Sequence, residues 1–266
     1  MATTANQGKR HHGSQLLSAM ALALLAVAAQ PAAATSAIKF TGFELGSVDV
    51  QLAATPAISI THANIGAYNA RISNDGGVTY GATFESFCID VWQNLAFNTQ
   101  YSLGPSSTYR YQASLVGVNT ATGTITQATV NNLSRLYAEA HAPGSVLNDA
   151  STTNDKIGSA ALQLAIWEIT YDTDKPSYNL GTGDFRSLNN TTADSQATIA
   201  LANGWLTNLA AYRADRYTIS GYLSSTRQDV IVFTAVPEPG TYALMLAGLG
   251  MLGYVGRRRK RNAAVA

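Results

Sequence analysis

Cys88 is the only cysteine in a chain of 266 residues, so its thiol is the first side chain to consider for chemistry. A single cysteine cannot belong to an internal disulfide framework, even in an oxidising compartment where such frameworks form. The thiol is therefore a buried packing residue, a bridge to another molecule, or a chemically active group.

Histidines and acidic residues give little indication of a metal site. His62 and His141 lie far apart in the sequence, and neither has a second ligand nearby. The segment 172–176 begins with Asp-x-Asp, like a calcium-binding loop, but Lys-Pro follows and no glutamate stands at the required distance. We expect surface or strand histidines, a solvated acidic loop, and neither metal nor cofactor.

Sequence motifs of the common enzyme classes are missing. The chain contains no G-x-S-x-G, no H-E-x-x-H and no P-loop. A carboxylate pair for glycoside hydrolysis stays open, because the separation of two carboxylates is a property of the fold. We predict that the protein is not an enzyme, with a secreted enzyme acting on extracellular polysaccharide as the alternative.

Two short segments resemble the paired motifs of bacterial thioester domains: Phe87-Cys88-Ile89-Asp90 and Leu162-Gln163-Leu164-Ala165-Ile166-Trp167. In those surface adhesins an aromatic-Cys-aliphatic strand meets an aliphatic-Gln-x-x-aliphatic-aromatic segment, and the Cys and Gln side chains condense into an internal thioester. The resemblance covers roughly residues 84–172. It implies a bond between Cys88 and Gln163 in a β-sandwich-like body with helical additions. The alternative is a buried thiol beside a hydrogen-bonded glutamine.

The implied bond places demands on the elements that carry these residues. Attack of a thiolate on a carboxamide is uphill in water and becomes feasible when the fold holds the two groups at near-attack distance. A strand and a helix hold their side chains more rigidly than loops do. Ile166 and Trp167 lie on the Gln163 side of the expected helix and would exclude water. Phe87 and Ile89 flank the cysteine on its strand.

Strand patterns dominate the chain from residue 38 to about 112. A strong turn signal, Asn-Asp-Gly-Gly, occupies 74–77. The expected strand regions are 57–60, 62–72, 78–91 and 101–112, the last of these as a strand or a hairpin.

The middle of the chain changes to helical periodicity and the end returns to strands. Helices are expected at 126–140, from 154 or 155 to 171, and at 192–213, and strands at 216–223 and 228–235. This order predicts an α+β fold: a β-sandwich-like sheet body with a helical insertion of about three helices.

Residues 1–34 have the three regions of a cleavable signal peptide. Basic residues at 9–12 precede an apolar stretch at 16–29 that is too short to span a membrane. Small residues then form a cleavage site, expected after Ala34, with Ala37 as second choice. The folded domain is therefore expected at 35–235, and the protein is expected to be exported.

Residues 236–261 combine three features in a fixed order. A Pro-Glu-Pro motif, which no helix can contain, precedes an apolar run at 241–256 and a basic cluster at 257–261. As a helix the run would be roughly 24 Å long, short of the ~30 Å hydrocarbon core. The adjoining cations indicate a short transmembrane helix that ends in the cytoplasm. A buried core helix is the alternative, which the cations and the glycines of the run oppose.

The same order resembles the PEP-CTERM sorting signal of Gram-negative bacteria that make exopolysaccharide. The resemblance implies transient tethering in the inner membrane, cleavage near the Pro-Glu-Pro motif by an exosortase-type transpeptidase, and delivery to the cell surface or extracellular matrix. It rests on Pro237, Glu238, Pro239, Arg257, Arg258 and Arg259.

The charge of the expected mature domain argues against nucleic acid as a partner. The whole chain has a net charge of +1, but both ends are basic, and 35–235 is near −5. The first hypothesis is an adhesin-like protein of the surface or biofilm matrix, whose thioester would attach to surface amines or hydroxyls or to polysaccharide. The second is the secreted enzyme. A buried contact between Cys88 and Gln163 would favour the first, and exposed aromatic residues near an acidic cleft the second.

Overall fold

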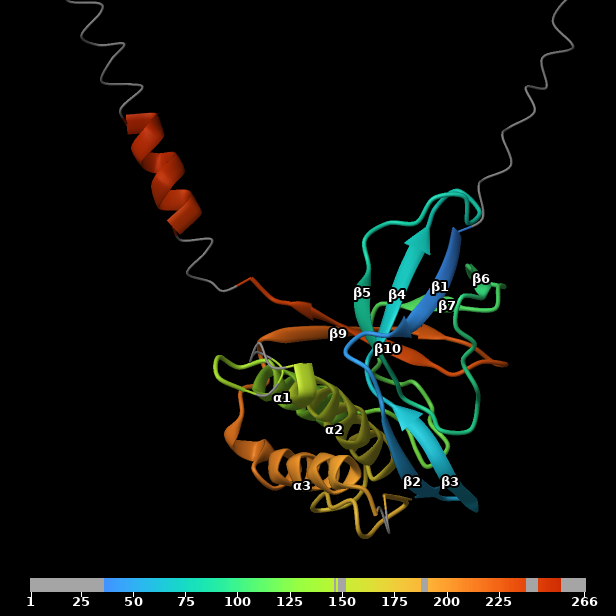
Figure 1. Ribbon diagram of the computed structural model, residues 1–266. Coiled ribbons are helices and arrows are strands. Elements are labelled where there is room, and N and C mark those ends of the chain that lie inside the picture. The colour runs from blue at the N-terminus through green and yellow to red at the C-terminus, as the bar shows by residue number, and fades with distance from the viewer. Residues whose placement is uncertain (1–35, 146, 148–151, 188–190, 238–243, 255–266) are drawn as a thin grey trace, which may run out of the picture. The chain divides into compact units, whose positions relative to one another are not determined.

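Two antiparallel sheets and three helices make up the folded body in the computed structural model (Figure 1). The structure describes residues 36–145, 147, 152–187, 191–237 and 244–254. The expected signal peptide lies outside these residues. All strand pairs are antiparallel, and the helices follow one another between two strands of the larger sheet, so the predicted α+β class and the helical insertion are confirmed.

The larger sheet has seven strands. Their spatial order is β6 (Gln100–Leu103), β1 (Ser36–Phe43), β4 (Tyr68–Ser73), β5 (Phe84–Cys88), β10 (Val230–Ala235), β9 (Tyr217–Leu223) and β7 (Arg110–Gln112). β5, which carries Cys88, is the central strand. The hairpin alternative for 101–112 is wrong, because β6 pairs with β1 at one edge and β7 pairs with β9 at the other.

The smaller sheet has the order β3 (Ile58–Ile65), β2 (Val48–Ala54) and β8 (Phe185–Arg186). β8 lies in the segment 172–190, for which the sequence predicted only a loop. Its two residues pair with Ala53 and Ala54, a contact between distant parts of the chain that local patterns do not encode.

Two predicted strand regions are shorter than expected. The region 62–72 divides at Gly66, whose positive φ of 158° turns the chain from β3 into β4. The region 78–91 forms a strand only from Phe84. The Asp75 carboxylate accepts hydrogen bonds from the backbone N–H groups of Val78 and Thr79, which commits this part of the chain to a turn.

The helices are α1 (Gln127–Ala140), α2 (Thr152–Tyr171) and α3 (Ala193–Thr207). Thr126 and Thr192 cap α1 and α3 with their side-chain oxygens. The prediction that the third helix continues to 213 is wrong. The Asn208 side chain donates to the Gly204 carbonyl, and a 3-10 helix, Leu209–Ala211, follows.

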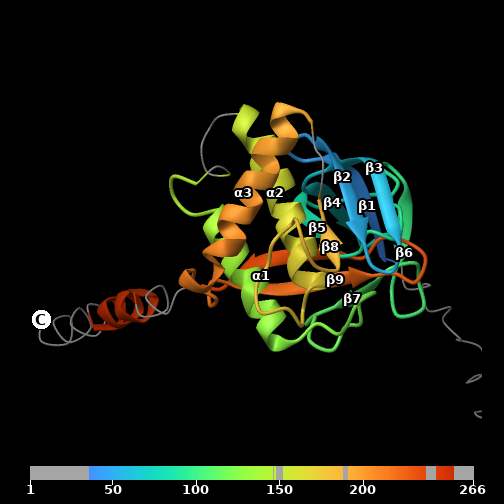
Figure 2. The same ribbon diagram turned by 90° about the horizontal axis from the view of Figure 1, so that it is seen from below.

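α2 is the central helix of the body. It lies between α1 and α3 and packs against β5 and the smaller sheet (Figures 1 and 2). Every residue from Gly158 to Tyr171 is buried, whereas the sequence predicted one apolar face. A helix enclosed on all sides holds its side chains firmly, including the polar ones that face β5.

The C-terminal segment is described only in part. Residues 244–254 are helical, and their large apolar side chains are exposed. Within the described residues, no helix has both the length and the hydropathy that crossing a membrane requires. Glu238, Pro239 and the three arginines 257–259 lie outside the described residues.

Candidate functional site

The end of β5 leaves the backbone of Cys88 open on one side. β4 pairs with β5 only as far as Ser86, opposite Tyr68. On the other side, Ile89 donates its N–H to the Asp229 carbonyl, and Cys88 lies opposite Val230 of β10. Hydrogen-bonding direction alternates along an antiparallel strand, so the N–H and C=O groups of Cys88 point toward the side that β4 has left.

The carboxamide of Gln163 fills the place of the missing strand. Cys88 donates its backbone N–H to Gln163 Oε1 at 3.0 Å, and Gln163 Nε2 donates to the Cys88 carbonyl at 2.8 Å. Both residues are fully buried. A buried amide with both ends bonded to one residue is held in a single orientation. The structure thus brings together the two residues that the motifs singled out.

A second side chain of α2 fixes the neighbouring backbone. Ser159 lies one turn before Gln163, and its Oγ accepts the N–H of Ala67 at 2.7 Å, where β4 begins. At Gly66, a Cβ atom would lie 2.7 Å from the Gly46 carbonyl oxygen and 3.3 Å from Ser159 Oγ. The chain therefore needs a glycine where it passes under α2, and this close passage lets the helix reach β5.

The surroundings of Cys88 favour the neutral thiol over the thiolate. Burial raises its pKa well above the usual range, and the carboxylates of Asp90 and Asp229 add to the shift. The neighbouring hydroxyl of Tyr68 acts in the opposite direction and lowers the pKa of the thiol. Cys88 forms no disulfide.

The four residues expected around the bond are all buried but occupy different places. Neighbouring residues of a strand point to opposite faces, so Phe87 faces away from the Cys88 side chain, toward Tyr137 and Phe233. Ile89 continues the chain beyond the strand. Ile166 and Trp167 lie one turn beyond Gln163 on α2, and Trp167 packs against Phe185.

Several residues that support the site were not singled out from the sequence. The Asp90 carboxylate accepts N–H groups from Trp92, Gln93 and Asp229, and so ties the end of β5 to the start of β10. Tyr171 accepts the N–H of Val91. Asp90 is the last residue of the cysteine motif, but its partner at 229 could only be found from the pairing of β5 with β10.

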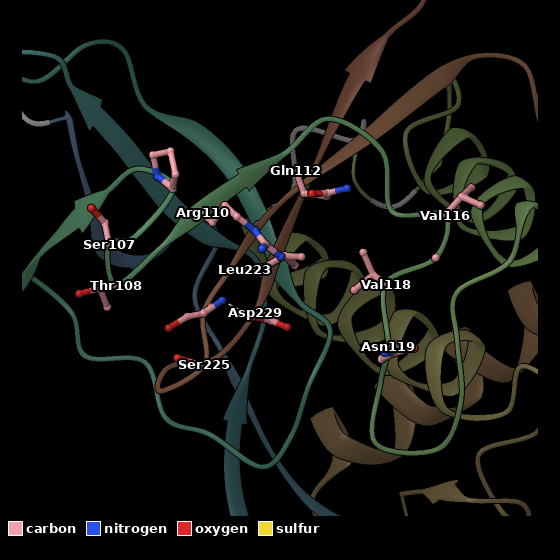
Figure 3. Close-up of a pocket in the computed structure, with 13 residues that line it drawn as sticks. Ser107, Thr108, Arg110, Gln112, Val116, Val118, Asn119, Leu223, Ser225 and Asp229 are labelled. Carbon is pink, nitrogen blue, oxygen red and sulfur yellow. Dashed lines mark hydrogen bonds between the residues drawn. The ribbon is translucent and has the colours of Figure 1, made fainter.

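Two cavities lie near the cysteine. The first, the Trp167 pocket, has a volume of about 410 Å³ and lies among Tyr68, Trp167, Val91, Gln228, and Ile60 and residues 62–65 of β3. The second, the Arg110 pocket, has a volume of about 520 Å³ and includes Arg110, Gln112, Val116 and Asp229 (Figure 3). Tyr68, the diagonal neighbour of Cys88 on the adjacent strand, lines the Trp167 pocket, and Asp229, whose carbonyl accepts the Ile89 N–H, lines the Arg110 pocket.

Each of the two histidines lies beside a carboxylate, and the acidic loop pairs with a lysine. His62 lies 2.8 Å from Asp49, and His141 lies 3.6 Å from Glu85. Asp174 pairs with Lys175. Among the described residues, no group of three or more metal-binding side chains could hold an ion.

Comparison with known proteins identifies the C-terminal segment. The model of the PEP-CTERM protein-sorting motif matches residues 235–260. The chain carries a PEP-CTERM sorting motif. A motif of this kind implies processing by an exosortase. No curated protein matches the chain.

Solved structures similar to the chain come from bacterial surface proteins. The N-terminal thioester domain of a Clostridium perfringens surface protein has 12% identity and a TM-score of 0.39, and the match covers 71% of this chain and 100% of that one. The N-terminal domain of the Streptococcus pyogenes pilus tip adhesin Cpa has 10% identity and a TM-score of 0.38, with 76% and 94% covered.

Proposed function

We propose that this protein is an exported surface protein whose folded domain forms an internal thioester between Cys88 and Gln163. The observation that carries the proposal is the double hydrogen bond between the Gln163 carboxamide and the Cys88 backbone. It orients the electrophile against the residue that bears the nucleophile.

The orientation of the carboxamide suits attack at its carbonyl carbon. The Cys88 N–H bonds to Gln163 Oε1, the oxygen that becomes negative when sulfur adds to the carbonyl. A fixed donor at such an oxygen stabilises the tetrahedral intermediate. The sulfur is three covalent bonds from that nitrogen, so rotation about the Cα–Cβ bond of Cys88 carries it toward the carbonyl carbon.

The reaction balances without any further reagent. The Cys88 sulfur forms a bond to Gln163 Cδ, the Cδ–Nε2 bond breaks, and the thiol proton leaves with the nitrogen as ammonia. The thiol keeps its proton at neutral pH because burial raises its pKa. The step therefore depends on the close placement of the two groups more than on a preformed thiolate.

A buried thioester gives an adhesin-like protein a protected electrophile. Cys88 and Gln163 have no exposed surface, so water is kept from the bond until a nucleophile enters. Opening by an amine or hydroxyl of a surface or of extracellular polysaccharide would attach the protein covalently. The sorting motif would bring the domain, through the inner membrane and an exosortase, to the surface or biofilm matrix of a Gram-negative cell.

The alternative function, a secreted enzyme acting on polysaccharide, has less support. A buried contact between Cys88 and Gln163 favours the adhesin over the enzyme, and this contact is present. We therefore propose a binding protein and not an enzyme.

Mass spectrometry of freshly purified protein tests the thioester. We expect a species lighter than the sequence by one ammonia, unreactive toward thiol reagents, from which methylamine releases a free thiol. Cys88→Ala and Gln163→Ala should both have their full sequence mass. A wild-type protein of full mass whose Cys88 is alkylated on unfolding, without amine treatment, would contradict the proposal.

A further inference from the structure

The Trp167 pocket and the Cys88 sulfur share one side chain, Tyr68. Tyr68 lies opposite Ser86 in the β4–β5 pair, so its side chain is on the same face of the sheet as Ser86 and Cys88. Cys88 is then its diagonal neighbour, within reach of a long side chain. The tyrosine hydroxyl and the thiol each shift the pKa of the other, as expected for close neighbours, and the same tyrosine side chain lines the pocket.

The tyrosine is held firmly in this position. Its ring stacks on Phe43 at 5.1 Å and packs against Phe97 at 5.6 Å, and only 6% of the residue is exposed. Burial, followed by the neighbouring Cys88, raises the pKa of its hydroxyl well above 10. Tyr68 therefore stays protonated at neutral pH and is a donor.

The pocket is lined by residues that lie close in sequence to both partners of the proposed bond. Trp167 lies one turn from Gln163, and Val91 lies three residues from Cys88. The residues that line the pocket include no lysine, arginine, aspartate or glutamate. A nucleophile in this pocket would meet Tyr68 before it meets the sulfur.

We propose that a nucleophile enters through the Trp167 pocket and that Tyr68 is the acid that protonates the Cys88 sulfur as the thioester opens. The inference rests on the proposed function, because it concerns the opening of that bond. The nucleophile's nitrogen forms a bond to Gln163 Cδ, the Cδ–Sγ bond breaks, and the sulfur takes the Tyr68 hydroxyl proton. The proton lost by the attacking nitrogen restores the hydroxyl.

Tyr68→Phe is the first test, since it removes the hydroxyl and keeps the ring that packs on Phe43. The full chain is analysed by intact mass and by its rate of reaction with methylamine. We expect the variant to be lighter by one ammonia, like the wild type. We expect its rate of reaction with methylamine to be about one tenth of the wild-type rate or lower, because general acids contribute factors of this size or larger.

The outcomes separate this inference from the proposed function. A variant that carries the bond and reacts at the wild-type rate overturns the role of Tyr68 and leaves the thioester intact. A full-mass variant that melts like the wild type also overturns it, because Tyr68 would then act in forming the bond. A wild-type protein of full mass would contradict the thioester itself.

A second pair of variants tests the path. Ala63→Phe narrows the Trp167 pocket, and Val116→Phe makes the matched change in the Arg110 pocket. We expect Ala63→Phe to slow the reaction with phenethylamine more than the reaction with methylamine. We expect Val116→Phe to leave the rates of both reactions unchanged. Equal rates in the two variants, or slowing by Val116→Phe alone, would overturn the path.

Discussion

At the scale of single residues, polar side chains enclosed by the core define the site. The side chains of Gln163 and Ser159 both form hydrogen bonds with backbone groups that are not paired to a neighbouring strand, those of Cys88 and Ala67. This use explains why a central helix carries polar groups at all, since a buried amide or hydroxyl without a partner would cost about 1–3 kcal/mol. The sequence signalled Gln163 through its motif. Ser159 and Tyr68 had no local signal, because their roles depend on where β4 begins.

A half-buried carboxyl, that of Glu85, is expected to make stability depend on pH. Glu85 lies on β5, accepts a hydrogen bond from the Tyr137 hydroxyl at 2.6 Å, and also faces Glu44 and His141. Burial raises its pKa to about 7. The native state then binds the proton more tightly than the unfolded chain, whose glutamate titrates near 4.5.

The sign of the effect follows from this raised pKa. Its stabilising contribution is complete below about pH 4.5 and is lost as the pH rises to about 7, by up to about 3 kcal/mol. In Glu85→Gln, the free energy of unfolding should fall less over this interval than in the wild type. Glu139→Gln, a half-buried change on α1, is the control. The free energy of unfolding of all three proteins is measured by denaturant titration at several pH values between 4.5 and 7. An equal change with pH in all three proteins would contradict the prediction.

At the scale of elements, the helices and the closing strands could be predicted, and the pairing of the strands could not. Thr126 and the apolar spacing after it locate α1 to within a residue. β8 has only two residues, and β6 and β7 separate to opposite edges of one sheet. Such features depend on contacts between distant segments. The two motifs of the candidate site could be recognised because each is a short continuous stretch of the sequence.

The break between β3 and β4 is the element-level feature on which the site most depends. Gly66 has φ of +158°, and an added Cβ would lie 2.7 Å from the backbone oxygen of Gly46. We expect Gly66→Ala to lower the free energy of unfolding by about 2 kcal/mol. Gly204→Ala is the matched control, because Gly204 lies in α3 with open space around it. This control should be neutral or more stable, by up to about 1 kcal/mol.

Thermal melting of the two alanine variants checks this prediction. The intact mass of Gly66→Ala is a second measurement, because it reports whether the proposed thioester forms. Movement of Ala67 away from Ser159 would weaken the contact between α2 and the backbone beside β5. If Gly66→Ala melts at the wild-type temperature, the close passage under α2 is not a constraint on the fold.

At the scale of the whole molecule, the chain separates a folded domain from a sorting segment. The last strand ends at Ala235, where the PEP-CTERM motif begins to match. The large apolar side chains of 244–254 are between 56% and 76% exposed. They therefore add no apolar burial to the core, whose buried residues lie between Ile38 and Ile231.

We therefore expect residues 35–235 to fold without the sorting segment. The truncated protein should unfold in one cooperative transition, within about 2 °C of the full chain in detergent, because the free energy of burial is the same in both. The Val236 N–H donates a hydrogen bond to the Arg216 carbonyl, and a chain that ends at Ala235 lacks this bond. A chain that ends at Val236 is therefore the matched control. Calorimetry and near-ultraviolet circular dichroism measure the comparison. A molten or insoluble 35–235 protein, beside a cooperative full chain, would mean that the sorting segment is part of the fold.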